Sequence, residues 1–173
     1  MAHAAVPGIT QEQKLEQWIR QYGTAILRTC FVYLSDAAQA EDAMQDTFLK
    51  AWNSMEKFDD RGDGAAKKWL MRIAINTCRD YRRSRWFRYV DRSKTLDDLP
   101  APMEAMSAQE RSLLIDIMHL PEKYKRVLLL YYYQEMTLQE TADVLGISRS
   151  TVHSRLQKAQ LLLKRILTGR EIR

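Results

Sequence analysis

The chain has 173 residues, 46% of them apolar, which is enough for one medium domain or two small ones around a buried core. Its formal net charge is +5, a mild excess that is compatible with a polyanionic partner but identifies none. The longest purely apolar run, VLLLYYY at 127–133, is too short to span a membrane, and the opening MAHAAVPGIT lacks the basic flank and long apolar segment of a secretory signal.

Apolar residues that recur every three or four positions predict three amphipathic helices between residues 12 and 90. The three series cover 15–33, 40–58 and 69–81, and Ser35 or Asp36 is a suitable cap for the second helix. The two cysteines, Cys30 and Cys78, fall on the apolar faces of the first and third helices. They form no disulfide framework, so we expect a protein of the reducing cytoplasm. Because the longest apolar run is too short to span a bilayer, we also expect no direct membrane insertion.

The second predicted helix lies in an acidic part of the chain. Residues 36–63 contain eight acidic and three basic residues, a net charge of −5 that would repel DNA. Four side chains at i, i+3, i+4 and i+7 form one stripe opposite the apolar series: Asp42, Gln45, Asp46 and Leu49. Such a stripe can meet a basic helical partner, although a charged stripe is more often solvated surface.

The third predicted helix is strongly cationic. Residues 65–92 contain nine basic and two acidic residues, a net charge of +7. Four aromatic residues are interleaved with them: Trp69, Trp86, Phe87 and Tyr89. Rings beside cations are typical of sites that hold single-stranded nucleic acid, because bases stack on the rings while the cations follow the backbone. A place in the core is the alternative for Trp69 and for Tyr81.

A linker and two more helices follow. Residues 95–110 carry two prolines and four acidic residues but no Lys or Arg, which is typical of an extended acidic linker. Helical patterns then cover about 107–118 and 121–135, the second opened by Pro121 at a first-turn position. The sequence has no strand pairs, repeats or βαβ spacing. It therefore predicts an all-α fold of two small helical domains.

The stretch TLQETADVLGISRSTVHSRL at 137–156 predicts a helix-turn-helix. Thr137 and Glu140 match a capping box that starts a short helix, and Gly146 supplies the left-handed residue that ends it. Ser148 is expected to cap a second helix whose inward residues include Val152 and Leu156. Its outward residues are Arg149, Ser150, Thr151, His153, Ser154, Arg155 and Lys158. With seven basic residues and one acid, 145–173 has a net charge of +6 that suits phosphates.

Three motifs in this order resemble those of a known bacterial family. They are AEDAMQDTFLKAW, KKWLMRIAINTCRDYRRSR and LPEKYKRVLLLYYYQEMTLQETADVLGISRSTVHSRLQKA. The chain resembles the small extracytoplasmic-function sigma factors of the sigma-70 family over about residues 12–167. The resemblance implies a transcription initiation factor that binds RNA polymerase core and directs it to specific promoters, without chemistry, metal or cofactor of its own.

The resemblance also implies a division of the chain. A sigma-2 domain at 12–92 would bind the clamp helices of RNA polymerase and open the minus-10 promoter element. The linker at 93–108 would run through the channel normally used by template or RNA. A sigma-4 domain at 109–170 would read the minus-35 element and grip the polymerase flap. An anti-sigma protein, commonly membrane-anchored, is a further partner implied by the family.

Individual residues receive roles from the same resemblance. Those implied to face the polymerase clamp are Asp42, Gln45, Asp46 and Leu49. Those implied to contact minus-10 DNA are Asp60, Arg61, Lys67, Lys68, Trp69, Met71, Arg72, Asn76, Arg79 and Arg83. Asn76 is the candidate for pairing with the edge of an unstacked base. The outward residues from Arg149 to Lys158 would contact minus-35 DNA. The family commonly has an aromatic residue at the position of Ala66, and a loop at 59–66 about two residues shorter.

Two other function classes fit parts of the sequence. A conventional repressor or activator would use the helix-turn-helix as a dimer on duplex operator DNA, without polymerase. A nuclease would use Asp59, Asp60 and Asp63 to bind Mg²⁺, although an acidic loop with glycines is usually solvated. The three histidines, at 3, 119 and 153, have no metal-ligand spacing with the cysteines.

Overall fold

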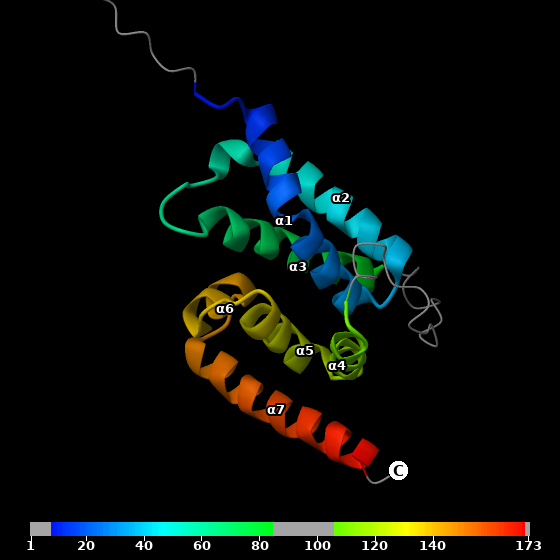
Figure 1. Cartoon of the computed structure of the whole chain (residues 1–173). Coiled ribbons are helices and arrows are strands. Elements are labelled where there is room, and N and C mark those ends of the chain that lie inside the picture. The colour runs from blue at the N-terminus through cyan, green and yellow to red at the C-terminus, as the bar shows by residue number, and fades with distance from the viewer. Residues whose placement is uncertain (1–7, 85–105, 172–173) are drawn as a thin grey trace, which may run out of the picture.

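A computed structural model describes residues 8–84 and 106–171, which form helices and no strands (Figure 1). The predicted all-α fold is therefore confirmed for this part of the chain. Three helices make an N-terminal body and four more, with a π-helical turn, make a C-terminal body. The segment 85–105 lies outside the described residues, and with it lie most of the predicted linker and the aromatic residues Trp86, Phe87 and Tyr89.

The N-terminal body consists of α1 (Gln11–Leu34), α2 (Ala37–Asn53), a short 3-10 turn η1 (Met55–Lys57) and α3 (Ala65–Arg83). The predicted cap of α2 is confirmed, because the Asp36 carboxylate accepts a 2.9 Å hydrogen bond from the Gln39 amide. Ser35 adopts a left-handed conformation with φ 58° and ends α1. The described part of α3 ends at Arg83, short of the predicted residue 90.

Three aromatic rings anchor the loop between α2 and α3. The ring centroid of Trp18 lies 4.9 Å from that of Phe58 and 5.8 Å from that of Trp69, and the Phe58 and Trp69 centroids lie 5.1 Å apart. The two contacts of Trp18 are edge-to-face, and aromatic pairs of this kind add stability beyond the burial of apolar area. Trp69 is thus part of the packing of this body, and its side chain is half-buried. Cys30 and Cys78 are fully buried free thiols.

The C-terminal body consists of α4 (Ala108–Met118), α5 (Glu122–Leu128), η5 (Leu129–Tyr133), α6 (Leu138–Leu145) and α7 (Arg149–Glu171). The predicted helix over 121–135 changes character after Leu128. Residues Leu129–Tyr133 form a π-helical turn, with the Gln134 amide donating to the Leu129 carbonyl five residues back at 3.1 Å. Glu135 then has a positive φ of 54°, which reverses the chain toward α6.

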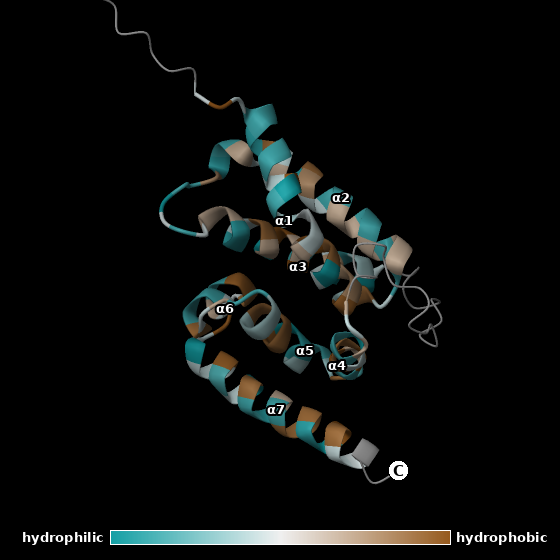
Figure 2. Cartoon of the chain, in the orientation of Figure 1, coloured by the Kyte–Doolittle hydropathy of each residue, from teal (hydrophilic) through white to brown (hydrophobic). Residues whose placement is uncertain are grey.

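The two bodies pack against each other in the described structure. Helix α6 contacts α3, while α4 and α5 contact α1 (Figure 1). Helix α7 packs on α5, α6 and α4, on the side of this body away from α1–α3. Apolar and polar residues are interspersed along α7 (Figure 2). Its buried residues, Val152, Leu156 and Ala159, recur every three or four positions, as in an amphipathic helix. None of the helices in the described part of the chain has the length and apolar character to cross a membrane.

Candidate nucleic-acid and polymerase interfaces

Helices α6 and α7 form the predicted helix-turn-helix. Thr137 and Glu140 make a complete capping box: the Glu140 amide donates to the Thr137 hydroxyl at 3.2 Å, and the Thr137 amide donates to the Glu140 carboxylate at 2.8 Å. Gly146 ends α6 in the left-handed conformation, with φ 65° and ψ 37°. Ser148 caps α7 by accepting a 3.1 Å hydrogen bond from the Thr151 amide. Local sequence chemistry therefore fixes where α6 begins and ends and where α7 begins.

The two faces of α7 separate core from surface. Val152, Leu156 and Ala159 are buried against α5 and α6, as the sequence predicted for the first two. Five of the seven predicted minus-35 residues are exposed and two are half-buried: the exposed ones are Arg149, Ser150, His153, Ser154 and Lys158, and the half-buried ones are Thr151 and Arg155. The first turns of α7 thus present hydroxyls, an imidazole and cations together on one accessible face.

The polar residues of α3 that are predicted to contact minus-10 DNA fall into two groups. Asn76, Arg79 and Arg83 are exposed, and Arg79 Nη2 donates a 2.8 Å hydrogen bond to Asn76 Oδ1. Lys67, Lys68 and Arg72 contact the C-terminal body, and of these Arg72 also remains exposed. The sequence prediction named both groups but contained no signal for this separation.

Met71 is the residue that the structure places differently from the prediction. Its side chain is fully buried, and its sulfur accepts a 3.6 Å hydrogen bond from the Thr29 hydroxyl of α1. The expectation that Met71 lies on the DNA-facing side of α3 is therefore wrong for this conformation. Its position on α3 falls between the cationic stripe and the apolar face, and the thioether is apolar enough to be drawn into the core.

The loop 59–66 lies against the start of α1. Lys14 Nζ lies 3.0 Å from Asp60 Oδ2, and Arg61 Nε donates to Asp59 Oδ1 at 2.8 Å. A pocket of about 520 Å³ lies between this loop and the start of α1. It is lined by Ile9, Lys14, Gln17, Trp18, Gln21, Tyr22, Asp60, Gly62, Asp63, Gly64, Ala65 and Ala66. Asp59 and Asp60 are thus each paired with a cation. Among the described residues there is no group of three or more His, Cys, Asp or Glu side chains arranged to hold a metal ion.

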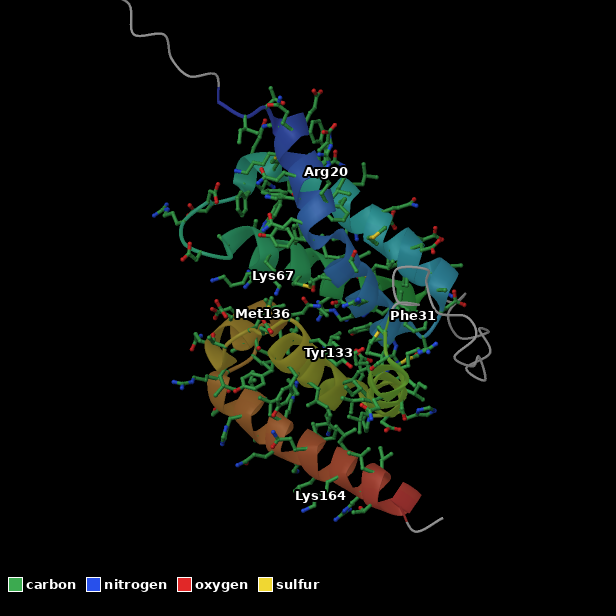
Figure 3. The ribbon with its side chains drawn as sticks, viewed as in Figure 1. Arg20, Phe31, Lys67, Tyr133, Met136 and Lys164 are labelled. Carbon is green, nitrogen blue, oxygen red and sulfur yellow. The ribbon has the colours of Figure 1, made fainter. Side chains whose placement is uncertain are left out.

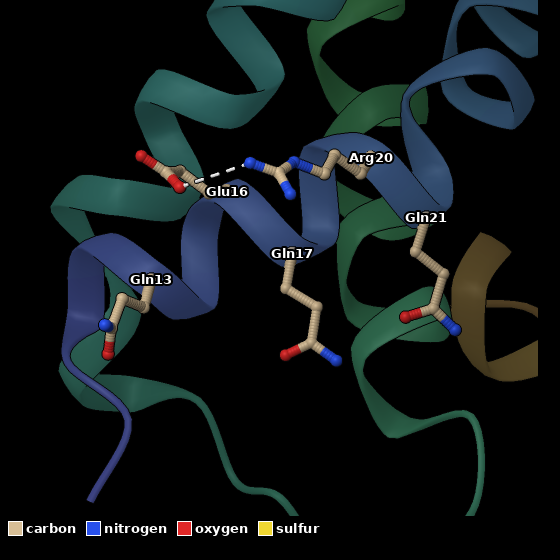
Figure 4. A pocket seen from close by; sticks show the side chains of 5 residues that line it. All are labelled: Gln13, Glu16, Gln17, Arg20 and Gln21. Carbon is tan, nitrogen blue, oxygen red and sulfur yellow. Dashed lines mark ion pairs between the residues drawn. The ribbon is translucent and has the colours of Figure 1, made fainter.

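A second, shallower pocket lies on the outer surface of α1. Its side chains all point away from the helix: Gln13, Glu16, Gln17, Arg20 and Gln21 (Figure 4). Arg20 Nη2 lies 3.7 Å from Glu16 Oε2, and both side chains are largely exposed. The pocket has one weak ion pair and no buried polar group, so it offers little to bind a ligand tightly.

The acidic stripe of α2 is only partly accessible. Asp42, Gln45 and Leu49 are exposed, and Leu49 presents 58% of its surface to solvent, a high value for leucine. Asp46 is half-buried and accepts a 2.7 Å hydrogen bond from the Tyr81 hydroxyl of α3. A single exposed leucine is ordinary on a protein surface, so the accessible part of the stripe is defined by its position on α2 and by the charge of Asp42.

Comparisons with known proteins place this geometry in a family. The model for sigma-70 region 2 matches residues 18–99, and the model for sigma-70 region 4 matches residues 117–163. The chain is 32% identical to RNA polymerase sigma factor YlaC of Bacillus subtilis, with 89% of this chain and 92% of that protein covered. It is 34% identical to the ECF RNA polymerase sigma factor SigL of Mycobacterium tuberculosis, with 83% of each covered. The chain belongs to the extracytoplasmic-function group of the sigma-70 family.

Solved structures agree with this assignment. CnrH, in complex with the cytosolic domain of CnrY, is 25% identical, with a TM-score of 0.67 and coverage of 91% of this chain and 90% of that one. Sigma factor RpoE of Bartonella quintana, in complex with the anti-sigma factor NepR, shares the fold with a TM-score of 0.71 at 22% identity, covering 88% and 98%. This sigma factor is therefore a transcription initiation factor that directs RNA polymerase to promoters. Sigma factors as a class are non-catalytic.

Proposed function

We propose that this sigma factor divides promoter recognition between its two bodies. The sigma-2 domain, residues 12–92, binds the polymerase clamp and the minus-10 element. The sigma-4 domain, residues 109–170, binds the minus-35 element and the polymerase flap, and a linker at 93–108 joins the two domains. The observation that carries the proposal is that the two cationic helices, α3 and α7, belong to different bodies, whereas α2 is acidic. Each has the charge that its proposed partner requires.

The sigma-4 domain reads duplex DNA with the start of α7. The capped turn between α6 and α7 holds the N-terminal residues of α7 forward, where a recognition helix meets base edges in the major groove. Arg and Lys side chains neutralise phosphates, and polar side chains read the bases. The proposed minus-35 contacts are Arg149, Ser150, Thr151, His153, Ser154, Arg155 and Lys158.

The sigma-2 domain holds the melted minus-10 strand along α3 and the loop 59–66. The exposed pair of Asn76 and Arg79 combines an amide that can match a base edge with a cation for the backbone. Holding a base outside the stack costs a few kcal/mol, which base-edge contacts and phosphate contacts offset. The proposed contacts are Asp60, Arg61, Lys67, Lys68, Trp69, Arg72, Asn76, Arg79 and Arg83. Met71 is left out because it is buried.

Protein partners meet the remaining surfaces. The stripe of Asp42, Gln45, Asp46 and Leu49 on α2 suits a basic coiled coil such as the polymerase clamp. The chain needs no active site of its own for this role, so we assign it no enzymatic activity. Since its partner polymerase and its promoters are in the bacterial cytoplasm, we place it there. The NepR complex of the similar RpoE supports a protein inhibitor as a further partner.

The test is to mix the purified chain with bacterial core polymerase and follow both on a sizing column. A stable complex should elute, and run-off transcription from a random promoter library should then select a defined pair of elements. Duplex binding by a dimer of the free chain, with no polymerase complex, would instead support the repressor alternative. Promoter-specific transcription that needs both core and this chain is the outcome we expect.

A further inference from the structure

Three cations of α3 are bound by the other half of the same chain. Lys67 Nζ donates a 2.6 Å hydrogen bond to the Gln134 carbonyl, and Lys68 Nζ lies 3.3 Å from Glu140 Oε1. Arg72 donates to the Asp143 carbonyl in the last turn of α6. Figure 3 shows Lys67 on the side of α3 that faces the turn carrying Met136. All three cations are therefore occupied by oxygen acceptors, the same chemistry that a phosphate backbone would supply.

The acceptors on α6 are well matched to these cations. Carbonyls in the last turn of a helix lack an intrahelical partner and carry the negative end of the helix dipole. The Glu140 carboxylate uses Oε2 for the capping box and Oε1 for Lys68, so one side chain both starts α6 and attracts α3. These polar contacts are reversible, as is usual where two domains of one chain meet.

Gln134 is the buried centre of this contact. Its side chain is only 4% exposed, and Nε2 donates to the Thr29 hydroxyl at 3.1 Å and to the Ala25 carbonyl at 3.3 Å, both on α1. Its own carbonyl accepts from Lys67 on α3. A buried amide is stable only when its hydrogen bonds are made. One residue of the C-terminal body thus joins two helices of the N-terminal body.

The chain around Gln134 is shaped for this purpose. The π-helical turn Leu129–Tyr133 and the positive φ of Glu135, 54°, bracket Gln134. Both conformations are uncommon for these residue types, and such conformations persist only where tertiary contacts hold them. The unusual backbone of this turn is therefore stabilised by the contacts of Gln134 with α1, and those contacts in turn require this backbone conformation.

We propose that Gln134 latches the free sigma factor in a closed state in which sigma-4 binds three of the strand-binding cations of sigma-2, namely Lys67, Lys68 and Arg72. This proposal rests on the proposed role of α3 in holding the minus-10 strand. A chain that binds the strand only when open has an apparent affinity reduced by the fraction of open molecules. The latch thus weakens binding of single-stranded DNA by the free chain, and a partner that separates the two bodies releases Lys67, Lys68 and Arg72 from their acceptors.

Two substitutions in the full chain test the latch. Gln134→Glu keeps the shape but replaces the donor by a carboxylate facing the Ala25 carbonyl, which penalises the closed state alone. Glu140→Gln keeps the capping box, because Gln also suits that position, but removes the charge that faces Lys68. Gln139→Glu is the matched control: it is the same change on exposed α6, where the Gln139 amide donates only within the helix, to Asp143. Circular dichroism establishes that each variant is folded.

Small-angle scattering and fluorescence anisotropy with a single-stranded minus-10 oligonucleotide supply the readouts, without polymerase. Gln134→Glu should enlarge the radius of gyration and tighten strand binding about tenfold, with a smaller gain for Glu140→Gln and none for Gln139→Glu. A folded Gln134→Glu chain with the wild-type radius and wild-type affinity overturns the latch.

Arg79→Ala in the Gln134→Glu chain separates this proposal from the proposed function. Arg79 lies on α3 outside the set that sigma-4 binds, so its loss should weaken strand binding if α3 holds the strand. No loss would overturn the strand-binding role of α3, while the radius of gyration would still decide whether the chain closes. If Arg79→Ala weakens binding but the opened chain binds no tighter than wild type, the pairing of these cations with sigma-4 has no effect on DNA binding and the latch is overturned.

Discussion

Tyr81 of α3 donates a 2.7 Å hydrogen bond to Asp46 Oδ2 of α2, and so joins the cationic helix to the acidic helix. Burial, the bond to Asp46 and the neighbouring charges of Asp46 and Asp42 all raise the pKa of the Tyr81 hydroxyl. The hydroxyl therefore remains a neutral donor well above physiological pH. Within the acidic stripe, Asp46 is held in place by this bond, whereas Asp42 is exposed.

Replacing Tyr81 by Phe should weaken both the fold and polymerase binding. The ring packing is kept, but Asp46 loses a donor, so we expect the free energy of unfolding in urea to fall by about 0.5–1.5 kcal/mol. The Tyr81→Phe chain should also compete less well than the wild-type chain for core polymerase, because the Asp46 side chain is no longer held in one orientation. Tyr132→Phe is the comparison: it removes a hydroxyl that accepts a hydrogen bond from Gln160 on an exposed surface, so a smaller loss of stability is expected. Wild-type stability of Tyr81→Phe would show that the bond contributes nothing.

Glu122 predicts a pH dependence of stability. Burial raises its pKa, but the hydrogen bond from Tyr33 and the charges of Arg82 and Arg126 outweigh burial, so the pKa lies below its ordinary value of 4.5. Arg82 Nη1 lies 2.7 Å from Glu122 Oε2. A carboxyl whose pKa is lower in the folded than in the unfolded chain stabilises the fold above the unfolded pKa. That contribution is lost as the pH falls through the folded pKa.

Glu122→Gln should therefore destabilise the chain near neutral pH, by on the order of 1 kcal/mol. The difference from wild type in the free energy of unfolding should shrink to nothing as the pH falls below the ordinary range of a glutamate. Urea unfolding at a series of pH values measures this difference. The control is Glu16→Gln, whose partner Arg20 is 3.7 Å away on an exposed surface and should contribute little. A difference that persists unchanged in acid would contradict the linkage.

Features of the fold that depend on neighbouring residues could be predicted from the sequence. The cap at Asp36, the capping box of Thr137 and Glu140 and the left-handed Gly146 all involve groups within a few positions of each other. Residue type and spacing determine such features, because the hydrogen bonds close within one turn. The inward Val152 and Leu156 follow from helical periodicity alone.

Features that depend on contacts between distant segments could not be predicted. Whether Met71 turns inward is decided by its contact with Thr29, 42 residues earlier in the chain. The occupation of Lys67 by Gln134 joins residues 67 positions apart, and no local pattern distinguishes Lys67 from the exposed Arg79. The sequence VLLLYYY likewise does not reveal the π-helical turn at Leu129–Tyr133. The same apolar residues suit an α-helical and a π-helical turn, so the pattern cannot distinguish the two.

Replacing Arg155 by Ala should weaken recognition of minus-35 promoters. Arg155 is half-buried on α7 near residues that the cap holds forward, and a lost base contact typically costs about 1–3 kcal/mol. We expect roughly tenfold less transcription from promoters that depend on the minus-35 element, with unchanged binding to core polymerase. Arg20→Ala, the same change at an exposed site on α1, should leave both unaltered. Release of Arg155→Ala from core would mean that α7 contacts polymerase instead.

Replacing Asn76 by Ala should impair promoter opening more than closed-complex formation. Arg79 already occupies the Oδ1 acceptor of Asn76, so Nδ2 is the group left to meet a base edge. Because that contact exists only after a base has left the stack, its loss acts on the melted state. Permanganate footprinting measures melting, and filter binding measures the closed complex. Asn53→Ala, at the end of α2, is the control. Equal loss of both complexes would exclude the base-pairing role.

Replacing Gly146 by Ala should destabilise the helix-turn-helix through the backbone alone. No atom lies within 4 Å of the position that a Cβ would take, so the substitution creates no clash. The φ of 65° is nevertheless unfavourable for alanine, by about 1–2 kcal/mol. Gly146→Asn should lose less, because Asn tolerates the left-handed conformation. Thermal unfolding measures the order wild type, Asn, Ala. Equal losses for Asn and Ala would show that the side chain meets an obstacle, and that the turn is not held by backbone conformation alone.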